Sequence, residues 1–138
     1  MAVELQEGYK PSEKEEYMSD MQLEYFRQKL LNWRQELSEE SGDTISHLQA
    51  ENWQEPDIND RATLETDAAL ELRTRDRYRK LINKIDKMLD LVADGTYGYC
   101  EKTGEEIGIA RLEVRPIATM TIEAQEKHER LEKQRRDD

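Results

Sequence analysis

The chain has 138 residues, of which 36% are apolar and 38% are charged, and its formal net charge is −11. This length suits one ordinary domain, and the low apolar content excludes a thick globular interior. A composition this charged, with few Gly and Pro, is typical of long helices packed as a coiled coil. The negative charge argues against bulk binding to nucleic acid, because phosphates attract clustered Lys and Arg.

Targeting and disulfide signals are missing from the sequence. The N-terminus lacks the apolar core of a signal peptide, and no segment approaches the ~20 apolar residues of a membrane span. The single cysteine, Cys100, excludes an intrachain disulfide. We therefore expect a soluble cytoplasmic protein without membrane contact, whose disorder is confined to the ends, including a flexible segment over residues 1–18.

Residues 19–95 are predicted to form a hairpin of two long helices. The first begins near Asp20, after the capping-box pattern Ser19–Gln22, and ends near Glu51, which gives a length of roughly 45 Å. Its inward stripe has helical spacing and becomes polar around Gly42. The stripe consists of Phe26, Leu30, Trp33, Leu37, Ser41, Thr44 and Leu48.

The second helix is expected to begin after residues 57–60 and to stop at Asp94-Gly95, where Gly can adopt the left-handed conformation. Small Ala68 and Ala69 would let the helices approach closely. Two helices of similar length joined by a short turn run antiparallel. The predicted inward stripe consists of Leu64, Ala68, Leu72, Arg75, Arg79, Ile82, Ile85, Leu89 and Val92.

The turn between the helices, residues 55–62, is the tip of this hairpin. Pro56 stops the first helix because it lacks an N–H and its ring clashes with a preceding helical turn. Asp57, Asn59 and Asp60 are residue types that cap the start of a helix. Capping and the helix dipole alone explain these acids, but a long rigid scaffold also suits a functional turn, so both interpretations stay open.

A basic stripe occupies the second helix. Residues 73–87 hold seven basic residues against two acidic ones, a local charge of +5, so the remainder of the chain carries −16. Helical spacing places five of them on one face: Arg73, Arg77, Lys80, Lys84 and Lys87. The face is either solvated and balanced by the acidic first helix, or a docking face for an acidic partner or a phosphorylated ligand.

Residues 96–138 change character and suggest a small separate module. Tyr97–Cys100 and Ile107–Ile109 are short β-prone segments, which predicts a small hairpin. Thr121 is expected to cap a final helix that ends near Arg136. Its sparse inward candidates are Ile122, Gln125 and Leu131, and a modest shared core would include Trp33, Met88, Tyr97 and Ile107.

Catalytic and metal sites are not indicated. Neither His47 nor His128 stands near Cys100 in sequence, and no phosphate loop or nucleophile elbow is present, so we do not expect an enzyme. Cys100–Gly104 has the outline of a zinc knuckle whose second cysteine is replaced. Structural zinc needs four ligands, which one thiolate cannot supply. We expect no zinc and interpret Cys100 as a small buried hydrophobic residue, with a reactive thiol as the alternative.

Together these residues resemble the DksA/TraR family of bacterial RNA polymerase-binding transcription factors over nearly the full length. The resemblance implies a mainly α fold: a long antiparallel coiled-coil hairpin, a small zinc-finger-like β-hairpin/helix module and a C-terminal helix. The motifs that show the resemblance are Asp57-x-x-Asp60-Arg61-Ala62, Leu70-Glu71-Leu72-Arg73-x-Arg75-Asp76-Arg77, Tyr97-Gly98-Tyr99-Cys100-Glu101, and Ile107-Gly108-Ile109-x-Arg111-Leu112-Glu113-x-Arg115-Pro116.

The resemblance implies a monomer that inserts its coiled coil into the secondary channel of RNA polymerase without binding DNA. Asp57, Asp60 and Ala62 match the family's tip residues near the polymerase catalytic centre. Such proteins destabilise open promoter complexes together with ppGpp in the stringent response, repressing ribosomal RNA promoters and activating some biosynthetic ones. The basic face that would dock on polymerase consists of Arg73, Arg77, Lys80 and Lys87.

Two sites depart from the family pattern. The family's four-cysteine zinc site survives only as Cys100, with Thr103, Thr121 and Ala124 at the other positions. The ppGpp site formed with polymerase matches Leu81, Lys84 and Arg115, but its third basic position is Gln125. Losing one charge-assisted contact costs ~1.5–3 kcal/mol, so we expect a weakened ppGpp response. A Gre-like factor that promotes transcript cleavage and a structural coiled-coil adaptor are the alternative functions.

Overall fold

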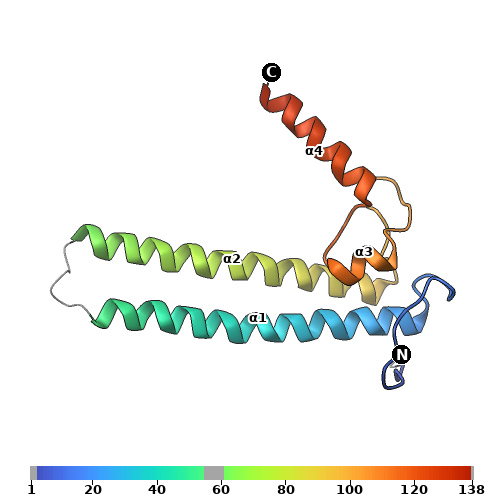
Figure 1. Cartoon of the computed structure of the whole chain (residues 1–138), viewed down its shortest axis with the longest axis horizontal. Helices are drawn as coiled ribbons and strands as arrows, with labels where there is room; N and C mark the ends of the chain where they lie inside the picture. Colours follow the sequence, from blue (N-terminus) through green and yellow to red (C-terminus); the bar gives the residue numbers. More distant parts are fainter. Residues whose placement is uncertain (1–2, 55–60, 138) are drawn as a thin grey trace. The chain divides into compact units, whose positions relative to one another are not determined.

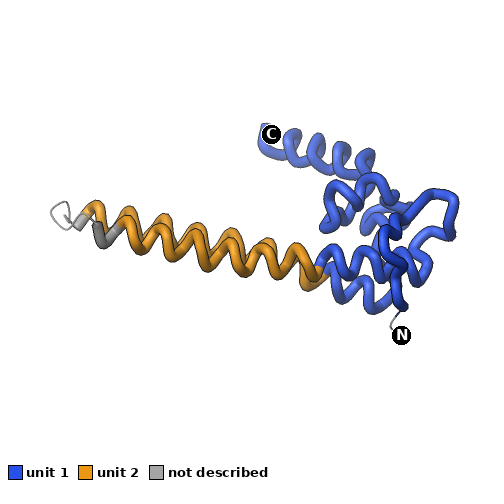
Figure 2. Tube along the Cα trace, turned by 60° about the horizontal axis from the view of Figure 1, so that its bottom comes forward, with its two compact units in different colours: residues 1–30, 88–138 blue, residues 31–87 orange. Residues whose placement is uncertain are grey.

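The computed structural model describes residues 3–54 and 61–137. Four helices follow one another along the chain, α1 (Asp20–Gln54), α2 (Arg61–Asp94), α3 (Ile109–Val114) and α4 (Ile122–Asp137) (Figure 1). The chain packs as two compact units, residues 1–30 with 88–138 (unit 1) and residues 31–87 (unit 2) (Figure 2). The predicted mainly α fold, with its helical hairpin and C-terminal helix, is confirmed. None of the helices described is long and apolar enough to cross a membrane.

The start of α1 follows from its capping residues. The Gln22 N–H donates to Ser19 Oγ over 3.3 Å, as a capping box requires. The Gln22 side chain differs from the expected pattern, because its Oε1 accepts the N–H of Met18 at 2.8 Å and its Nε2 donates to the Ser12 carbonyl at 3.1 Å. This fully buried amide thus satisfies its own polar groups and ties down the segment before α1.

The helix ends agree with the sequence within a few residues. Helix α1 ends at Gln54, slightly beyond the expected Glu51, and α2 ends at Asp94. Gly95 follows with φ of 78°, and its N–H donates to the Val92 carbonyl at 3.1 Å, as predicted for a left-handed helix stop. The predicted roles of Pro56 and of the capping residues Asp57, Asn59 and Asp60 lie outside the described residues.

The α1 stripe is confirmed in unit 2, where α1 and α2 lie side by side (Figure 1). Leu37 is 6% exposed, and Ile85 on α2 is fully buried. Further along α1 the half-buried side chains are a mixture of polar and aliphatic groups, Ser41, Thr44, Ile45 and Leu48. The seam between the helices therefore changes from apolar to mixed polar and apolar along its length.

The predicted stripe of α2 is wrong for the half of the helix nearest the tip. Leu64 is 49% exposed and Leu72 is 67% exposed. The other expected inward or closely packed residues of this half, Ala68, Ala69, Arg75 and Arg79, are exposed as well. The half-buried side chains of this half are instead polar or aromatic and include Asp67, Glu71, Thr74 and Tyr78.

Hydrogen bonds between the helices explain why α2 turns this polar face toward α1 and not the predicted one. The Tyr78 hydroxyl donates to Glu40 Oε1 at 3.1 Å and lies 3.4 Å from Thr44 Oγ1. Gln49 Nε2 donates to Glu71 Oε1 at 3.0 Å. Beyond Gly42 most side chains of α1 are polar, and its half-buried apolar ones are Ile45 and Leu48. Leucines turned toward this part of α1 would meet few apolar partners, whereas the polar face of α2 finds hydrogen-bond partners there.

Unit 1 contains the more apolar core. Phe26 and Leu30 from α1 are fully buried, as is Leu112 from α3, and Tyr97 is 1% exposed. The rings of Phe26 and Tyr97 lie 5.6 Å apart between centroids, and the Tyr97 hydroxyl donates to the Pro116 carbonyl at 2.7 Å. The expected core residues Met88, Tyr97 and Ile107 are buried here, while Trp33 belongs to unit 2 and is half-buried.

The segment before α1 packs closely on the loop that follows α2. The Tyr17 hydroxyl donates to the Gly98 carbonyl at 2.6 Å and accepts the Gly108 N–H at 3.0 Å. Gly98 has φ of 96°, and an added Cβ would lie 3.0 Å from both Met18 Cγ and Tyr17 Oη. Position 98 therefore requires glycine for its backbone conformation and for the close approach of the N-terminal segment.

The predicted β-hairpin is reduced to a turn. The described residues form no β-strand, and the pairing between the two segments is a single antiparallel bridge between Tyr99 and Glu106. The Ile107 N–H donates to the Gly98 carbonyl at 2.9 Å, and the short helix α3 then begins where the second β-prone segment was expected to continue. Hairpins this short lack the cross-strand pairs that stabilise longer ones.

Helix α4 begins where Thr121 predicts, but its expected packing is wrong. Thr121 Oγ1 accepts the Ala124 N–H at 3.1 Å, and the helix continues to Asp137. No residue of α4 is buried: Ile122 is 51% exposed and Leu131 is 50% exposed, while Gln125 is half-buried. Too few apolar residues share one face of this helix to bury it.

Two adjacent leucines provide a stability test of the core. Leu30 is fully buried, whereas Leu31 is 39% exposed. We expect Leu30→Ala to lower the free energy of unfolding by about 2–5 kcal/mol, because it removes core contacts and leaves a cavity. Leu31→Ala should lower it by less than about 1 kcal/mol. Urea unfolding followed by circular dichroism measures both, and equal losses would contradict this assignment of the core.

Candidate functional site

The tip of the hairpin carries the first group of predicted site residues. Asp57 and Asp60 lie outside the described residues. Ala62 lies in the first turn of α2 and is exposed, and its carbonyl accepts a hydrogen bond from Thr66 Oγ1 at 2.9 Å. The roles of the two aspartates and of Ala62 stay predictions.

The basic stripe of α2 is exposed along its whole length. Its members Arg73, Arg77, Lys80, Lys84 and Lys87 are all exposed. Lys80 Nζ pairs with Asp76 Oδ2 at 3.0 Å, and the other four form no ion pair within the described part of the chain. The ion pair that joins α1 to α2 in unit 2, Arg34 with Asp86 at 2.7 Å, uses none of these residues. The acidic first helix therefore does not neutralise the stripe by direct pairing among the described residues.

Arg75 and Arg79 pair with carboxylates of their own helix instead of entering the seam. Arg75 Nη2 lies 2.9 Å from Glu71 Oε1, and the hydrogen bond from Arg75 lowers the pKa of Glu71. Arg79 pairs with Asp76, whose pKa is lowered chiefly by Lys80 and further by Arg79. Such pairs along one helix keep long cationic side chains on its surface.

Cys100 lies in a tight turn of unit 1. Its N–H donates to the Glu105 carbonyl at 2.8 Å, and its own carbonyl accepts the Gly104 N–H at 2.9 Å. The next residue, Glu101, donates its N–H to the Thr119 carbonyl at 2.8 Å. The side chain is buried, with 3% exposure. The turn is thus closed by backbone hydrogen bonds within the chain.

Hydrogen bonds to the sulfur make Cys100 more than the small buried hydrophobic residue that the sequence suggests. Burial by itself would raise the pKa of the thiol. The Thr103 hydroxyl and the N–H groups of Thr121, Lys102 and Thr103 donate to the sulfur, and together they lower the pKa from 9.0 to about 7. Several donors aimed at one sulfur atom stabilise a thiolate.

Comparisons with known proteins identify the family. Residues 22–92 match the family described as DnaK suppressor protein DksA, N-terminal domain, and residues 95–130 match the prokaryotic dksA/traR C4-type zinc finger. The chain belongs to the DksA family. It is 64% identical to the RNA polymerase-binding transcription factor DksA of Caulobacter vibrioides (strain NA1000 / CB15N) over 130 residues, covering 94% of this chain and 92% of the relative.

More distant DksA proteins agree with this assignment. The protein of the same name from Escherichia coli K12 is 48% identical over 128 residues, covering 93% of this chain and 85% of that protein. The solved structure of transcription factor DksA2 from Pseudomonas aeruginosa superposes with a TM-score of 0.70 at 38% identity, covering 85% of this chain and 90% of that one. The family resemblance stated from the sequence is therefore confirmed.

The residues of the DksA zinc-finger module here do not fit zinc. Of the four positions named for the family's C4 site, only Cys100 carries a thiol; Thr103 and Thr121 carry hydroxyls and Ala124 a methyl group. Thr121 Oγ1 already accepts the Ala124 N–H, and Thr103 Oγ1 accepts the Glu105 N–H at 3.3 Å. No group of three or more His, Cys, Asp and Glu side chains among the described residues is placed to hold a metal ion.

The residues that match the family's ppGpp site lie on three different parts of the chain. Leu81 is half-buried and Lys84 is exposed, both on α2. Arg115 is exposed and follows α3, and its N–H donates to the Arg111 carbonyl at 2.8 Å. Gln125 on α4 is half-buried and donates through Nε2 to Glu129 Oε1 at 3.0 Å. Their common role in one site stays a prediction.

Sequence reasoning missed the donors around Cys100 and the pocket beside them. The Thr103 and Thr121 positions were recognised as lost cysteines, but their hydrogen bonds to the remaining sulfur were not foreseen. Ser and Thr hydroxyls can donate to an anion as well as accept, which is the signal that the residue types carried. The backbone N–H donors depend on the conformation of the turn, which residue types alone do not reveal.

The thiol of Cys100 should titrate near neutral pH. Because the folded pKa of about 7 lies below the ordinary 9.0, the thiolate stabilises the folded state above pH 9, and this contribution is lost as the pH falls through 7. The ultraviolet absorbance of the thiolate, with Cys100→Ser as the blank, measures the pKa. Thr103→Val should raise it, because one donor is removed. A pKa near 9 in the unaltered protein would contradict these sulfur contacts.

Proposed function

We propose that this protein binds bacterial RNA polymerase in the cytoplasm and regulates transcription initiation. The observation that carries the proposal is the 64% identity over 94% of the chain with a DksA named as an RNA polymerase-binding transcription factor. The identity covers both the helical hairpin and the C-terminal module. We propose that the protein acts as a monomer, without direct DNA contact and as a regulator instead of an enzyme.

The hairpin supplies the means of reaching the polymerase active site through the secondary channel. Its helices contain 35 and 34 residues, so each is roughly 50 Å long at 1.5 Å per residue. In this proposal Asp57 and Asp60 act at the far end, where carboxylates would perturb loops or the metal environment of the catalytic centre. Ala62 permits a close approach, which its exposed position supports. The result would be a less stable open promoter complex.

The basic face of α2 is the proposed docking surface on polymerase. Arg73, Arg77, Lys80 and Lys87 are exposed, and only Lys80 forms an ion pair among the described residues. In a chain of net charge −11, a cationic stripe favours approach to an acidic protein surface. Charges of this kind influence the association rate and its salt dependence more than the final affinity.

The same complex would respond to ppGpp, as part of the stringent response. Leu81, Lys84 and Arg115 are the proposed contacts, and the exposure of Lys84 and Arg115 leaves both cations accessible to phosphate oxygens. Gln125 replaces a third basic residue and cannot form a charge-assisted bond to phosphate. We therefore propose that ppGpp acts through this protein, but more weakly than through a family member with a lysine at that position.

The module of unit 1 is proposed to be metal-free. Its turn is closed by backbone hydrogen bonds, and the sulfur of Cys100 is occupied by hydrogen-bond donors. Elemental analysis of the purified protein should find far less than one zinc per chain, and prolonged chelation should leave the thermal unfolding midpoint unchanged. Near-stoichiometric zinc, or unfolding caused by the chelator, would contradict this proposal.

Promoter-complex decay tests the role of the tip. We expect the protein to shorten the lifetime of open complexes at a ribosomal RNA promoter, and Asp60→Asn to remove most of this effect without weakening polymerase binding. The reason is that this substitution removes one carboxylate charge and leaves every residue of the proposed docking face unchanged. A gel-based decay assay with a parallel co-purification measures both. An Asp60→Asn protein that binds and remains fully active would contradict the role of the tip.

Further measurements test the response to ppGpp and the two alternative functions. Addition of ppGpp should strengthen the effect modestly, and Gln125→Lys should increase this strengthening while leaving the activity without ppGpp unchanged. Incubation with backtracked complexes tests the Gre-like alternative, which predicts shortened RNA. Failure of the unaltered protein to co-purify with polymerase would favour the structural adaptor.

A further inference from the structure

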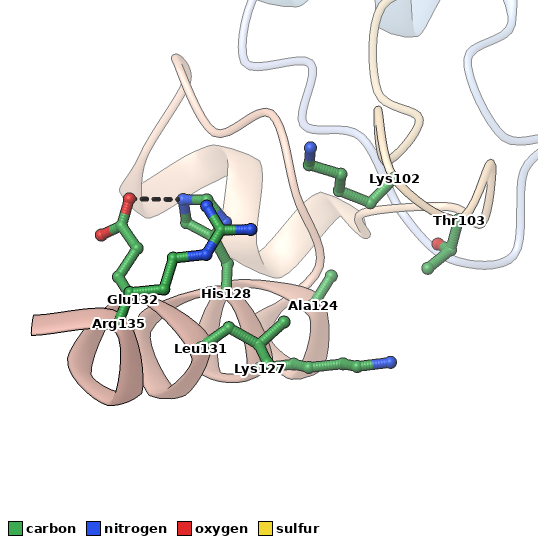
Figure 3. A pocket seen from close by; sticks show the side chains of 8 residues that line it. All are labelled: Lys102, Thr103, Ala124, Lys127, His128, Leu131, Glu132 and Arg135. Carbon is green, nitrogen blue, oxygen red and sulfur yellow. Dashed lines mark ion pairs between the residues drawn. The ribbon is translucent and has the colours of Figure 1, made fainter. Parts of the chain in front are cut away.

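A pocket in unit 1 lies between the Cys100 turn and helix α4 and is not used by the proposed function. Its volume is about 430 Å³. Lys102 and Thr103 line it from the turn, and residues of α4 between Ala124 and Arg135 line it from the other side (Figure 3). This volume falls in the range of small-molecule sites, roughly 300–1,000 Å³.

The floor of the pocket is apolar surface that the chain leaves uncovered. Helix α4 buries none of its residues, and Leu131 is 50% exposed where it lines the pocket. Ala124, about two helical turns closer to the start of α4, lines the pocket as well (Figure 3). An apolar ligand group placed here would shield the Leu131 side chain from water. Packing within the chain itself leaves this side chain half exposed.

The rim of the pocket is cationic. Lys102, Lys127 and Arg135 line it, and none of them forms an ion pair with another residue that the structure describes. The carboxylate in the lining, Glu132, is engaged by His128, with 3.1 Å between Oε1 and Nε2. Three cations around one hollow contrast with the net charge of −11 for the whole chain.

We propose that this pocket binds a small amphipathic anion, namely a carboxylate attached to an apolar body such as a medium-chain fatty acid. The carboxylate would meet Lys127, Arg135 or Lys102 at the rim, where charge-assisted hydrogen bonds are strongest. The apolar body would cover Leu131 and Ala124. An inorganic anion would leave the apolar floor in water, and a neutral apolar molecule would leave the cations unpaired. The combination of floor and rim therefore selects the amphipathic anion.

Binding is tested on the full chain with a ligand series that separates charge from apolar contact. Octanoate, octanol and acetate are titrated into ¹⁵N-labelled protein, and backbone amide shifts are followed. Octanoate should give saturable shifts concentrated at Lys102, Thr103 and the residues of α4 that line the pocket. Octanol and acetate should bind at least about tenfold more weakly, since each lacks one half of the recognition.

Matched charge variants then locate the site on α4. Lys127→Gln combined with Arg135→Gln should weaken octanoate binding at least about tenfold. Arg130→Gln combined with Lys133→Gln removes the same charge from another surface of α4, which those residues line with Glu126 and Glu129. This control should change the dissociation constant less than about twofold.

Several results would overturn the proposal. Equal affinity for octanol and octanoate would show apolar contact alone, and equal affinity for acetate and octanoate would show a nonspecific anion effect. Equal weakening by the two double variants would show that only the overall charge matters. Shifts that never saturate below the micelle-forming concentration would also reject a defined site. The proposal is independent of polymerase binding, so these results leave the proposed function untouched.

Discussion

The hydrogen bonds of Tyr78 to Glu40 and Thr44 hold the two long helices together where their apolar seam gives way to polar residues. Near unit 1 the seam is built by side chains such as Leu37 and Ile85, each worth about 1.5–3 kcal/mol when buried. Toward the tip, Ile45 and Leu48 are only half-buried, and the seam depends in part on hydrogen bonds that contribute about 0.5–1.5 kcal/mol each. The hairpin is therefore held most weakly at the end that the proposed function places inside polymerase. Regions with few buried apolar contacts open locally at lower free energy than the core.

This polar seam also determines what α2 presents to its surroundings. Turning Glu71 and Tyr78 toward α1 leaves Leu64 and Leu72 on the surface, at 49% and 67% exposure. It also leaves Arg73 and Arg77 exposed without ion pairs among the described residues. The orientation of α2 about its own axis thus leaves both the exposed leucines and the basic stripe on its surface. Exposed apolar groups beside charges are typical of surfaces that bind other proteins.

The sequence predicted the elements better than the faces they bury. Helix boundaries depend on local signals, and Ser19, Gly95 and Thr121 all acted as expected. Which face α2 turns toward α1 depends on the polarity of α1, so the leucine spacing alone predicted the wrong inward face. The tip residues were identified through the family pattern, because local chemistry had left open whether Asp57 and Asp60 do more than cap a helix. The backbone donors around Cys100 could not be foreseen, because backbone N–H groups carry no sequence signature.

The turn at Cys100 shows how the replacement of three of the family's four zinc-binding cysteines alters the chemistry of this module. A thiolate that binds structural zinc forms one coordinate bond to an ion that three further ligands share, whereas this sulfur receives hydrogen bonds from Thr103, Thr121 and the turn backbone. Threonine at two former ligand positions supplies hydroxyl groups of similar size, one of which caps α4 through the Ala124 N–H. The start of α4 is thus fixed by Thr121 without a metal. Because the rest of α4 buries nothing, its inner face stays open, and the pocket beside Lys102 exists for that reason.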